Sequence, residues 1–336
     1  MRALVLSGPG HAEVLDVPAP VPEPGEVVID VQRAGICGTD MELFSGEMQY
    51  LHTGHARYPL RIGHEWMGTV TTLGEGVPPS WLGLRVTGDT MVGCGTCRRC
   101  TSGRQHVCEF RYEIGVRGGR PGALAEQVAV PIRALHVLPP AVSDAAGAIV
   151  EPAANSYRAV EAAGLSEGER LLVFGPGTLG LLCAMFGRAR GLDVHLMGRS
   201  DESLAFARQL GFAQAYAEDD LPEVRFDTVI DASNAGHLPA KAVEVVEPGR
   251  KVVYLGISGA PSLVDTRNLV LADVTAVGVL SGSPCIDDTI AAFATGAVDP
   301  GSLVAGTVAL EELPDIMAGR RPSRLGPGPK IHVTLT

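Results

Sequence analysis

Residues 171–191 read LLVFGPGTLGLLCAMFGRARG, which is an apolar run, a glycine-rich turn and a second apolar run in direct succession. The turn has the spacing G-x-G-x-x-G, formed by Gly175, Gly177 and Gly180. Between a strand and a helix, the first glycine permits the tight turn, the second lets the backbone approach a pyrophosphate, and the third lets helix and strand pack closely. We therefore predict a dinucleotide site here, with Thr178 and Leu179 at the helix N-terminus, where partial positive charge faces the phosphates.

The rest of the second half alternates short β-rich runs with helical stretches. This alternation predicts a doubly wound α/β fold, in which helices cover both faces of a parallel sheet. Such a sheet holds its ligand at the carboxyl ends of the strands, so Ser233 and Leu255 are further candidates for cofactor contacts. The predicted strands are 170–174, 194–197, 227–231, 251–255 and 274–279, and the helical stretches include 155–163 and 202–210.

The first half has a different texture, because glycine and proline concentrate there between short runs of alternating polarity. This pattern predicts a twisted β barrel or sandwich with long loops. The alternating runs include 26–31, 67–73 and 125–130. After a last helix at 287–295 the chain ends in a β run at 330–335, which we expect to rejoin the first domain.

A length of 336 residues suits about two domains at roughly 100 to 200 residues each. We place the β-rich domain at 1–151 and 298–336, and the nucleotide-binding domain at 152–297. The formal net charge of -11 argues against a nucleic-acid partner. No stretch reaches the roughly 18 apolar residues of a membrane span, and the opening MRALVL is too short for a signal peptide. We therefore expect a cytoplasmic protein with no membrane partner.

The reducing cytoplasm would keep the seven cysteines as thiols or metal ligands rather than disulfides. Four of them form C-x2-C-x2-C-x7-C within GCGTCRRCTSGRQHVC: Cys94, Cys97, Cys100 and Cys108. Four thiolates on one short loop can surround a tetrahedral Zn2+ ion without help from distant parts of the chain. An iron–sulfur cluster is the alternative, but the last spacing is seven and no proline follows Cys108. We predict a structural zinc, which has no open position for chemistry.

A second set of metal-ligand residue types is spread along the chain. Cys37 lies in GICGTD, His64 and Glu65 lie in IGHEWMG, and Glu151 lies in IVEPAANSYRAV. A catalytic zinc needs three protein ligands and one exchangeable position, and it accepts cysteine, histidine and carboxylate. Each residue alone is a weak signal, because a lone cysteine is more often a core residue and His–Glu pairs are common on surfaces.

In chain order the sequence resembles the zinc-dependent medium-chain alcohol and polyol dehydrogenases over essentially its whole length. The motifs that carry the resemblance are CGTD, GHE, the four-cysteine loop, the dipeptide EP and the glycine-rich turn. The resemblance implies a GroES-like catalytic domain joined to a Rossmann domain. It also implies that Cys37, His64 and Glu151 bind the catalytic zinc and that Glu65 is a swinging or water-bridged ligand.

The same resemblance bears on substrate and proton transfer. The ethanol-type branch has a cysteine where this chain has Glu151, so the polyol and sugar branch, with hydroxyl-rich substrates, is favoured. Thr39 would be the hydroxyl next to the metal. Many members carry a histidine five residues after the zinc cysteine, and here that position is Glu42. Glu42, His52 or His55 would then form the outer proton relay, while the simpler reading of both histidines is as exposed loop residues.

Cofactor choice is predicted from the end of the strand at 194–197, which runs into Gly198, Arg199 and Ser200. NAD-specific sites place Asp or Glu there to accept from the adenosine ribose. With glycine at that position, Arg199 and Ser200 can bind a 2'-phosphate, so we favour NADP(H) over NAD(H). In the alternative interpretation, Arg199 points to solvent and Asp201 binds the ribose.

These inferences combine into an enzyme with two Zn2+ ions per chain and a small hydroxylated substrate. Zinc would lower the pKa of the substrate hydroxyl, and the resulting alkoxide would pass hydride to the nicotinamide. A sugar, polyol or cyclitol is preferred, then an amino alcohol such as threonine, then a simple secondary alcohol. Residues 47–61 and Glu113 would line the pocket or form an ordinary loop. A zinc-free quinone or enoyl reductase and a non-catalytic relative remain alternatives, and we expect a homo-oligomer, a dimer or tetramer.

Overall fold

The structure is a computed structural model that describes residues 1–335. The chain forms two compact units: Met1–Glu151 with Ile286–Thr336, and Pro152–Cys285. The chain passes from the first unit to the second between residues 151 and 152, which is the predicted boundary. It returns to the first unit between residues 285 and 286, whereas the predicted boundary is between 297 and 298. The helix α10 (Ile286–Ala294) therefore belongs to the first unit, where Asp287 in its first turn pairs with His136 at 2.6 Å.

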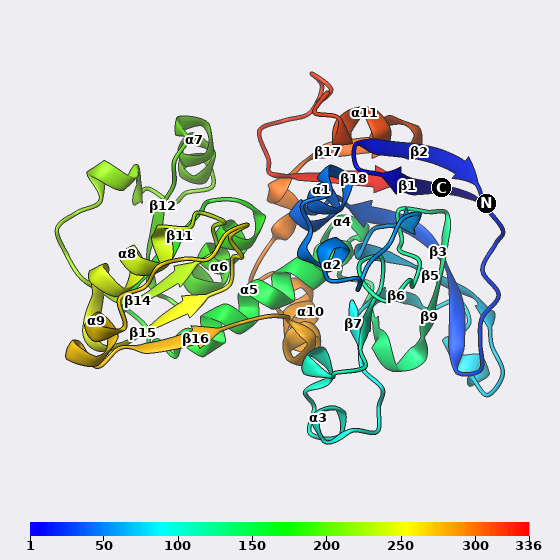
Figure 1. The fold of residues 1–336 in the computed structure, drawn as a ribbon, viewed down its shortest axis with the longest axis horizontal. Helices are drawn as coiled ribbons and strands as arrows, with labels where there is room; N and C mark the ends of the chain where they lie inside the picture. The colour runs from blue at the N-terminus through cyan, green and yellow to red at the C-terminus, as the bar shows by residue number, and fades with distance from the viewer. Residues whose placement is uncertain (336) are drawn as a thin grey trace. The chain divides into compact units, whose positions relative to one another are not determined.

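The first unit is rich in β structure, as predicted, and is built around a seven-stranded sheet with the order β10-β6-β5-β3-β18-β17, in which β9 also pairs with β3 (Figure 1). A smaller sheet has the order β2-β1-β4. The strands of the larger sheet are β3 (Glu26–Gly35), β5 (Glu65–Leu73), β6 (Arg85–Gly88), β9 (Gln127–Pro131), β10 (Leu135–Val137), β17 (Val304–Ala309) and β18 (Lys330–Thr334). Those of the smaller one are β1 (Arg2–Gly8), β2 (His11–Asp16) and β4 (Leu60–Arg61).

The two-residue period of β3 explains how this sheet is anchored. Val27, Ile29 and Val31 are completely buried and join the core of the unit, because alternate side chains of a strand point to the same face. On β18, Val333 lies opposite Ala34 of β3, and both are in the same core. The neighbouring residues His332 and Gly35 consequently face the other side of the sheet, where Glu65 of β5 also lies opposite Gly35.

The remaining elements of the first unit are short. The helix α1 (Gly38–Ser45) has Cys37 as its N-cap and ends at Gly46, whose φ of 87° is left-handed. The other helices are α2 (Gln49–His52), α3 (Arg98–Thr101), α4 (Asp144–Gly147) and α11 (Leu313–Met317). A two-stranded sheet pairs β7 (Met91–Val92) with β8 (Tyr112–Glu113). These elements position most of the predicted metal ligands.

The second unit is the predicted parallel sheet, with six strands in the order β13-β12-β11-β14-β15-β16. The order reverses between β11 and β14, which is the position where such sheets bind ligands. The strands are β11 (Arg170–Phe174), β12 (Asp193–Met197), β13 (Ala215–Tyr216), β14 (Phe226–Asp231), β15 (Val246–Tyr254) and β16 (Thr275–Gly278). The helices are α5 (Val150–Ala163), α6 (Thr178–Ala189), α7 (Asp201–Gln209), α8 (Leu238–Val245) and α9 (Thr266–Leu271).

Helix α6 packs against β11 and β12, and α8 packs against β14 and β15. Among the described residues, no helix is long and apolar enough to cross a membrane.

Candidate metal and nucleotide sites

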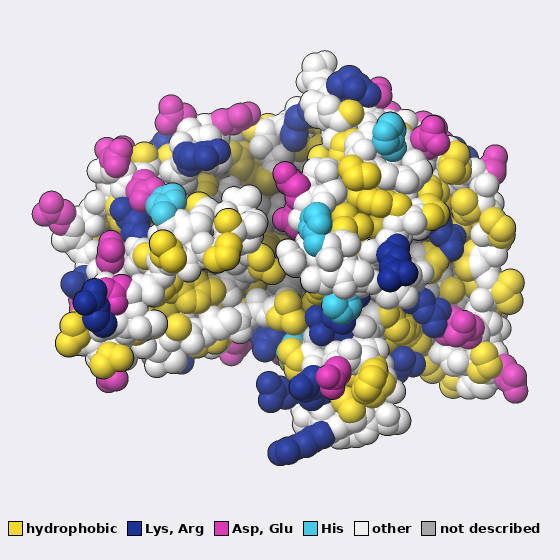
Figure 2. Space-filling model, viewed as in Figure 1, with side chains coloured by type: hydrophobic (Ala, Val, Ile, Leu, Met, Phe, Trp, Pro, Cys, Tyr) yellow, Lys and Arg dark blue, Asp and Glu magenta, His cyan; other side chains and the backbone are white. Residues whose placement is uncertain are grey.

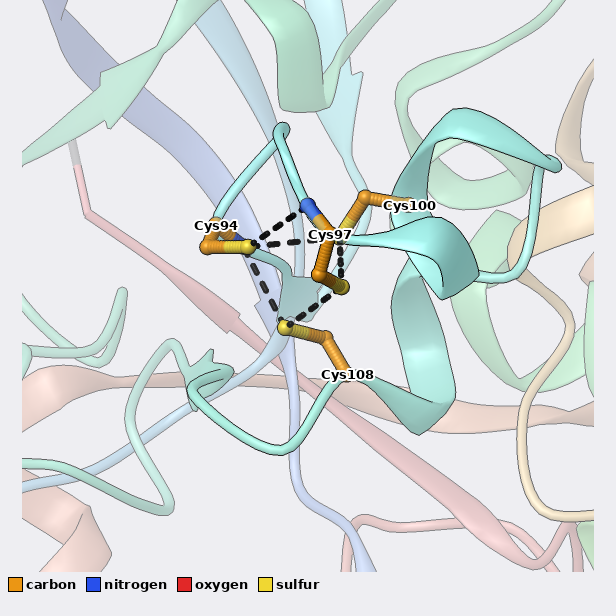
Figure 3. A group of neighbouring side chains, drawn as sticks. All are labelled: Cys94, Cys97, Cys100 and Cys108. Atoms are coloured by element: carbon orange, nitrogen blue, oxygen red, sulfur yellow. Dashed lines mark hydrogen bonds between the residues drawn. The ribbon is translucent and has the colours of Figure 1, made fainter.

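The four-cysteine loop folds its sulfurs toward one another (Figure 3). The Sγ atoms of Cys97 and Cys100 are 3.6 Å apart, those of Cys97 and Cys108 are 3.8 Å apart, and those of Cys94 and Cys100 are 3.9 Å apart. Four sulfurs at about 2.3 Å from one tetrahedral Zn2+ ion would lie about 3.8 Å from each other. The loop therefore fits a zinc ion closely.

Local hydrogen bonds favour the thiolate form of Cys94, whereas burial raises the pKa of Cys100 to about 12. The hydroxyl and backbone of Thr96 and the backbone N–H of Cys97 surround the sulfur of Cys94 and lower its pKa to about 5. The close packing of this loop also requires glycine at position 93, because a Cβ at Gly93 would lie 2.6 Å from the sulfur of Cys100. With all four positions taken by cysteine, such a site stabilises the loop and leaves no coordination position for a substrate.

The second predicted ligand set comes together only in part. The ligand atoms of Cys37, His64 and Glu65 all lie within 4.8 Å of one another. Cys37 stands between β3 and α1, while His64 and Glu65 lie at the start of β5, with exposed fractions of 6% and 0%. Glu151 lies in the first turn of α5 and, within the described part of the chain, is not a member of this group.

Asp40 supports two members of the group, and the sequence analysis did not find it. Its Oδ2 accepts a hydrogen bond from the backbone N–H of Cys37 at 2.9 Å, and its Oδ1 lies 3.6 Å from Nδ1 of His64. Burial alone would lower the pKa of His64, but the Asp40 carboxylate and the Cys37 sulfur outweigh it and hold the pKa well above its usual value. The signal was the spacing within CGTD, which places Asp40 at the third helical position after the N-cap.

Lys330 is the second supporting residue that the sequence analysis missed. Its Nζ donates to Oε2 of Glu65 at 2.6 Å and to the carbonyl of Ile36 at 2.9 Å, and both side chains are almost completely buried. The ion pair between Lys330 and Glu65 lies against Gly35 of β3. A Cβ at this position would be only 2.5 Å from Oε2 of Glu65, so a glycine is needed there. A lysine in an apolar run, in a chain with 24 Arg among its 27 basic residues, was the only hint in the sequence.

The donor types of this group suit a divalent cation. Cys37, His64 and Glu65 offer a sulfur, an imidazole nitrogen and a carboxylate oxygen, and the carboxylate of Asp40 and the ammonium of Lys330 lie beside them. Oε1 of Glu65, Oδ1 of Asp40 and Nδ1 of His64 are buried without a hydrogen-bond partner. Buried polar atoms without a partner are unfavourable unless they bind a ligand such as a metal ion, and zinc accepts cysteine, histidine and carboxylate, so the donor set fits Zn2+.

The predicted proton-transfer residues occupy α1 and the segment after it. Thr39 is half-buried in the first turn of α1, and Glu42 is exposed one turn later. Although the residue as a whole is exposed, partial burial of its carboxylate and the neighbouring Glu47 raise the pKa of Glu42. His52 and His55 are both exposed, and Nδ1 of His55 bonds to the hydroxyl of Thr53 at 2.8 Å.

Glu113, a candidate for lining the pocket, is buried and fully engaged. Its Oε1 accepts from the hydroxyl of Tyr50 at 3.0 Å and from Nε of Arg111 at 2.9 Å, and Arg117 approaches it at 4.0 Å. The guanidinium of Arg117 also lies over the ring of Tyr50. The carboxylate therefore anchors α2 to β8.

The glycine-rich turn has the geometry that its spacing predicts. Gly175 has a φ of 84°, and a Cβ there would meet Ser233 at 3.1 Å. A Cβ at Gly180 would collide with the carbonyl oxygen of Gly175, whereas nothing lies within 4 Å of a Cβ at Gly177. Gly177 is the N-cap of α6, followed by Thr178 and Leu179, so its open side is the approach to the helix N-terminus.

The ends of the neighbouring strands close this turn. Ser233 follows β14 and donates its hydroxyl to Oδ1 of Asp231 at 2.6 Å. Leu255 follows β15 and is buried, and a Cβ on the next residue, Gly256, would collide with the backbone of Ser233. The predicted cofactor residues of three strands thus meet where the strand order reverses.

At the carboxyl end of β12, where the cofactor preference is predicted to be set, the structure shows a steric constraint that the sequence did not reveal. A Cβ at Gly198 would lie 2.6 Å from Cγ of Pro176, so the glycine-rich turn itself excludes a side chain there. Arg199 is exposed, and among the described residues its guanidinium has no ion pair. Ser200 caps α7: its Oγ accepts from the N–H of Ser203 at 3.2 Å and donates to Oγ of Ser203 at 2.9 Å.

Comparison with known proteins identifies the families of both units of the chain. Residues 23–140 match the family model of the alcohol dehydrogenase GroES-like domain, and residues 178–295 match that of the zinc-binding dehydrogenases. The chain belongs to the zinc-dependent medium-chain alcohol and polyol dehydrogenase family. It is 33% identical to L-threonine 3-dehydrogenase of Anaeromyxobacter sp. (strain K), over 83% of each chain. It is 29% identical to sorbitol dehydrogenase of Halalkalibacterium halodurans, over 84% of this chain and 85% of that one.

Solved structures show the same architecture. An Escherichia coli CFT073 protein, described as a short chain alcohol dehydrogenase in complex with NADH, is 26% identical with a TM-score of 0.90, over 99% of both chains. A Sinorhizobium meliloti 1021 dehydrogenase bound to NADP is 26% identical with a TM-score of 0.89, over 99% of this chain and 98% of that one. The predicted family, fold class and oxidoreductase activity are confirmed.

Substitutions at two glycines of the turn should distinguish effects on stability from effects on cofactor binding in this dehydrogenase. Gly180→Ala should lower the free energy of unfolding by about 1–3 kcal/mol, because the added methyl meets backbone that cannot yield. Gly177→Ala should change it by less than about 0.5 kcal/mol, yet weaken cofactor binding by filling the open side of the turn. Thermal unfolding and cofactor titration measure the two effects. Equal losses of stability in both variants would contradict this account of the turn.

Proposed function

We propose that this dehydrogenase interconverts a secondary alcohol and its carbonyl compound by hydride transfer to and from NADP(H). The observation that carries the proposal is the group formed by the half-buried Cys37 and the buried His64 and Glu65, whose donor types suit a catalytic zinc. Cys37 and His64 would hold the ion, with Glu151 as the third protein ligand and Glu65 as the exchangeable one. Bound zinc would supply Lewis-acid polarisation of the substrate oxygen.

The chain's own residues prepare this chemistry. Asp40 faces Nδ1 of His64, so the neutral ring would carry its proton there and turn the lone pair of the other nitrogen to the ion. Lys330 retains one oxygen of Glu65 and leaves Oε1 to the metal group. Thr39, two residues after Cys37, would pass the hydroxyl proton outward. Glu42, one turn further along α1, would take it to solvent, helped by its raised pKa.

We propose a hydroxyl-rich substrate, a sugar, polyol or cyclitol, before an amino alcohol and a simple secondary alcohol. A carboxylate at Glu151, in place of cysteine, supports this order, and relatives named sorbitol and L-threonine 3-dehydrogenase are compatible with the first two classes. A panel of these alcohols, followed by absorbance of the reduced cofactor with NAD and NADP side by side, tests the order. Turnover of simple alcohols alone would overturn it.

We also propose a homo-oligomer, a dimer or tetramer, that acts in the cytoplasm. Among the described residues none of the seven cysteines forms a disulfide, in keeping with a reducing compartment. The strand β16 pairs only with β15 and ends its sheet, and the side chains of Leu263, Val270 and Leu271 near it are 88%, 80% and 85% exposed. Hydrophobic side chains are visible at the surface around α9 (Figure 2). An unpaired strand edge beside exposed apolar side chains favours pairing with a second copy.

Metal content distinguishes the two proposed zinc sites. The purified enzyme should hold two zinc ions per chain, and Cys37→Ala and Cys97→Ser should each hold one. Cys37→Ala should keep the fold and lose turnover, whereas Cys97→Ser should lower the unfolding temperature, because a closed four-thiolate site contributes folding free energy. Cys183→Ala, at a buried thiol that bonds to the carbonyl of Ser156, is the control and should keep both ions. Substantial activity of Cys37→Ala would refute the catalytic assignment.

Cofactor preference should depend on Arg199. Arg199→Gln removes a charge-assisted contact to the 2'-phosphate and should lower the NADP to NAD ratio of kcat/KM roughly ten- to hundredfold, mainly through KM. Arg190→Gln is the matched control, since Arg190 is already paired with Glu161 and should leave the ratio unchanged. The contact of Gly198 with Pro176 makes Arg199 a cleaner test than an aspartate at 198. A parent enzyme that prefers NAD would show that Arg199 faces solvent.

Association should depend on α9. Leu271→Lys combined with Val270→Lys should weaken self-association at least about tenfold, because two charges replace apolar contact area, while the exposed positions leave the folded chain unchanged. Val21→Lys, at an 85% exposed position of the first unit, serves as control. Light scattering over a dilution series gives the mass of each variant. An unaltered oligomer in the double variant would place the interface elsewhere.

A further inference from the structure

A second polar cluster lies on the face of the seven-stranded sheet that carries Glu65 and Lys330. It consists of Arg33 on β3, Thr307 on β17 and His332 on β18. Nη1 of Arg33 donates to the hydroxyl of Thr307 at 2.9 Å, and this bond spans β18, because β18 lies between the other two strands. Thr307 is also the register partner of His332. The three side chains are therefore neighbours on one face.

Several nitrogens of this cluster lack partners within the described residues. His332 is completely buried, and neither Nδ1 nor Nε2 has a hydrogen-bond partner. Nε of Arg33 is buried and unpaired as well. More than nine in ten buried polar groups in proteins are hydrogen-bonded, and none of these three nitrogens belongs to the metal group or to the nucleotide turn.

The charge of the cluster is also unbalanced. Lys330, the next charged residue on β18, is neutralised by Glu65, but no carboxylate of the described residues pairs with Arg33. Burial, with help from Lys330 and Arg33, lowers the pKa of His332 to about 3, so its ring is neutral at pH 7 and offers one N–H. The cluster thus presents one net positive charge and three kinds of donor: a guanidinium N–H, a hydroxyl and an imidazole N–H.

We propose that Arg33, Thr307 and His332 form a binding site for a small oxyanion, a phosphate or a carboxylate group. A cation would be repelled by Arg33, and a neutral ligand would leave the guanidinium charge unpaired. Arg33 and Thr307 are half-buried, and β17 is the edge of the sheet, so the anion enters from that edge. His332 closes the inner end, which limits the ligand to a small group.

This site goes beyond the dehydrogenase activity proposed above and does not depend on it. It lies two residues along β18 from Lys330, whose ammonium holds Glu65, so a bound anion would sit beside the strand that positions a proposed metal ligand. An oxyanion there would pair with Arg33 and accept from His332, and so satisfy Nε and one ring nitrogen. The ligand is thus either a free small anion or the anionic end of a larger metabolite.

Calorimetric titration with inorganic phosphate, and separately with acetate, in a chloride-containing buffer tests the proposal on the zinc-loaded enzyme. The parent should bind at least one of the two anions at millimolar concentration. Arg33→Gln should weaken that binding at least about tenfold, because it removes the charge-assisted hydrogen bond. Thr307→Val, which keeps the side-chain shape, should weaken it less. Binding of phosphate alone or acetate alone identifies the group that the site recognises.

Two control variants make the result specific. Arg85→Gln alters a half-buried arginine of the same sheet that is already paired with Asp144, and should leave anion binding unchanged. Arg199→Gln removes the proposed phosphate contact of the nucleotide site, and should also leave it unchanged. The proposal is overturned if neither anion binds, if Arg33→Gln binds as the parent does, or if Arg199→Gln alone abolishes binding. None of these readouts uses turnover, so failure here is distinct from failure of the proposed function.

Discussion

The buried ion pair between Glu65 and Lys330 ties together parts of the first unit that are 265 residues apart in the chain. Both groups leave water on folding, a cost that only close pairing and further hydrogen bonds can offset. The structure supplies these through the 2.6 Å contact, the bond of Lys330 to the carbonyl of Ile36, and the missing side chain at Gly35. Because β18 brings Lys330 into the sheet, the carboxylate of Glu65 gains its charge partner only when the C-terminal strand has joined.

The negative charges of the two proposed metal sites are compensated in different ways. The cysteine loop is local and partly exposed, and Arg98, Arg99 and Arg104 on the same loop lie at the surface near the thiolates. Four thiolates with one Zn2+ ion keep two net negative charges, which these arginines and water can screen. In the Cys37 group, by contrast, His64 and Glu65 are buried, and Lys330 pairs with Glu65, so a protein side chain rather than water balances the charge of this carboxylate.

Sequence analysis located features whose residues are close together in the chain. The glycine-rich turn and the four-cysteine loop each lie within about twenty residues, so spacing alone fixed their geometry. Pairings between distant segments were not accessible in this way. Asp40 was missed although it is three residues from Cys37, because its second partner, His64, comes from another strand. Lys330 and Gly35 acquire their roles only through the register of β5, β3 and β18.

The same limit applies to the second boundary between the units. Helical periodicity identified α10 but could not show which unit it packs with, and Asp287 pairs with His136 of the first unit. This contact is tertiary. The structure brings Cys37 and His64 together with Glu65, which the resemblance implied as a swinging ligand, and the role of Glu151 stays a prediction.

The contact between Pro176 and Gly198 restricts how this chain can change its coenzyme during evolution. A single substitution that introduces an acidic side chain at 198 would clash with the proline ring and disturb the turn proposed to bind the pyrophosphate. Loss of Pro176 would have to come first, and by itself it brings no gain. The two positions are therefore epistatic, and lineages that keep the proline are expected to adjust coenzyme use through residues 199–201 instead.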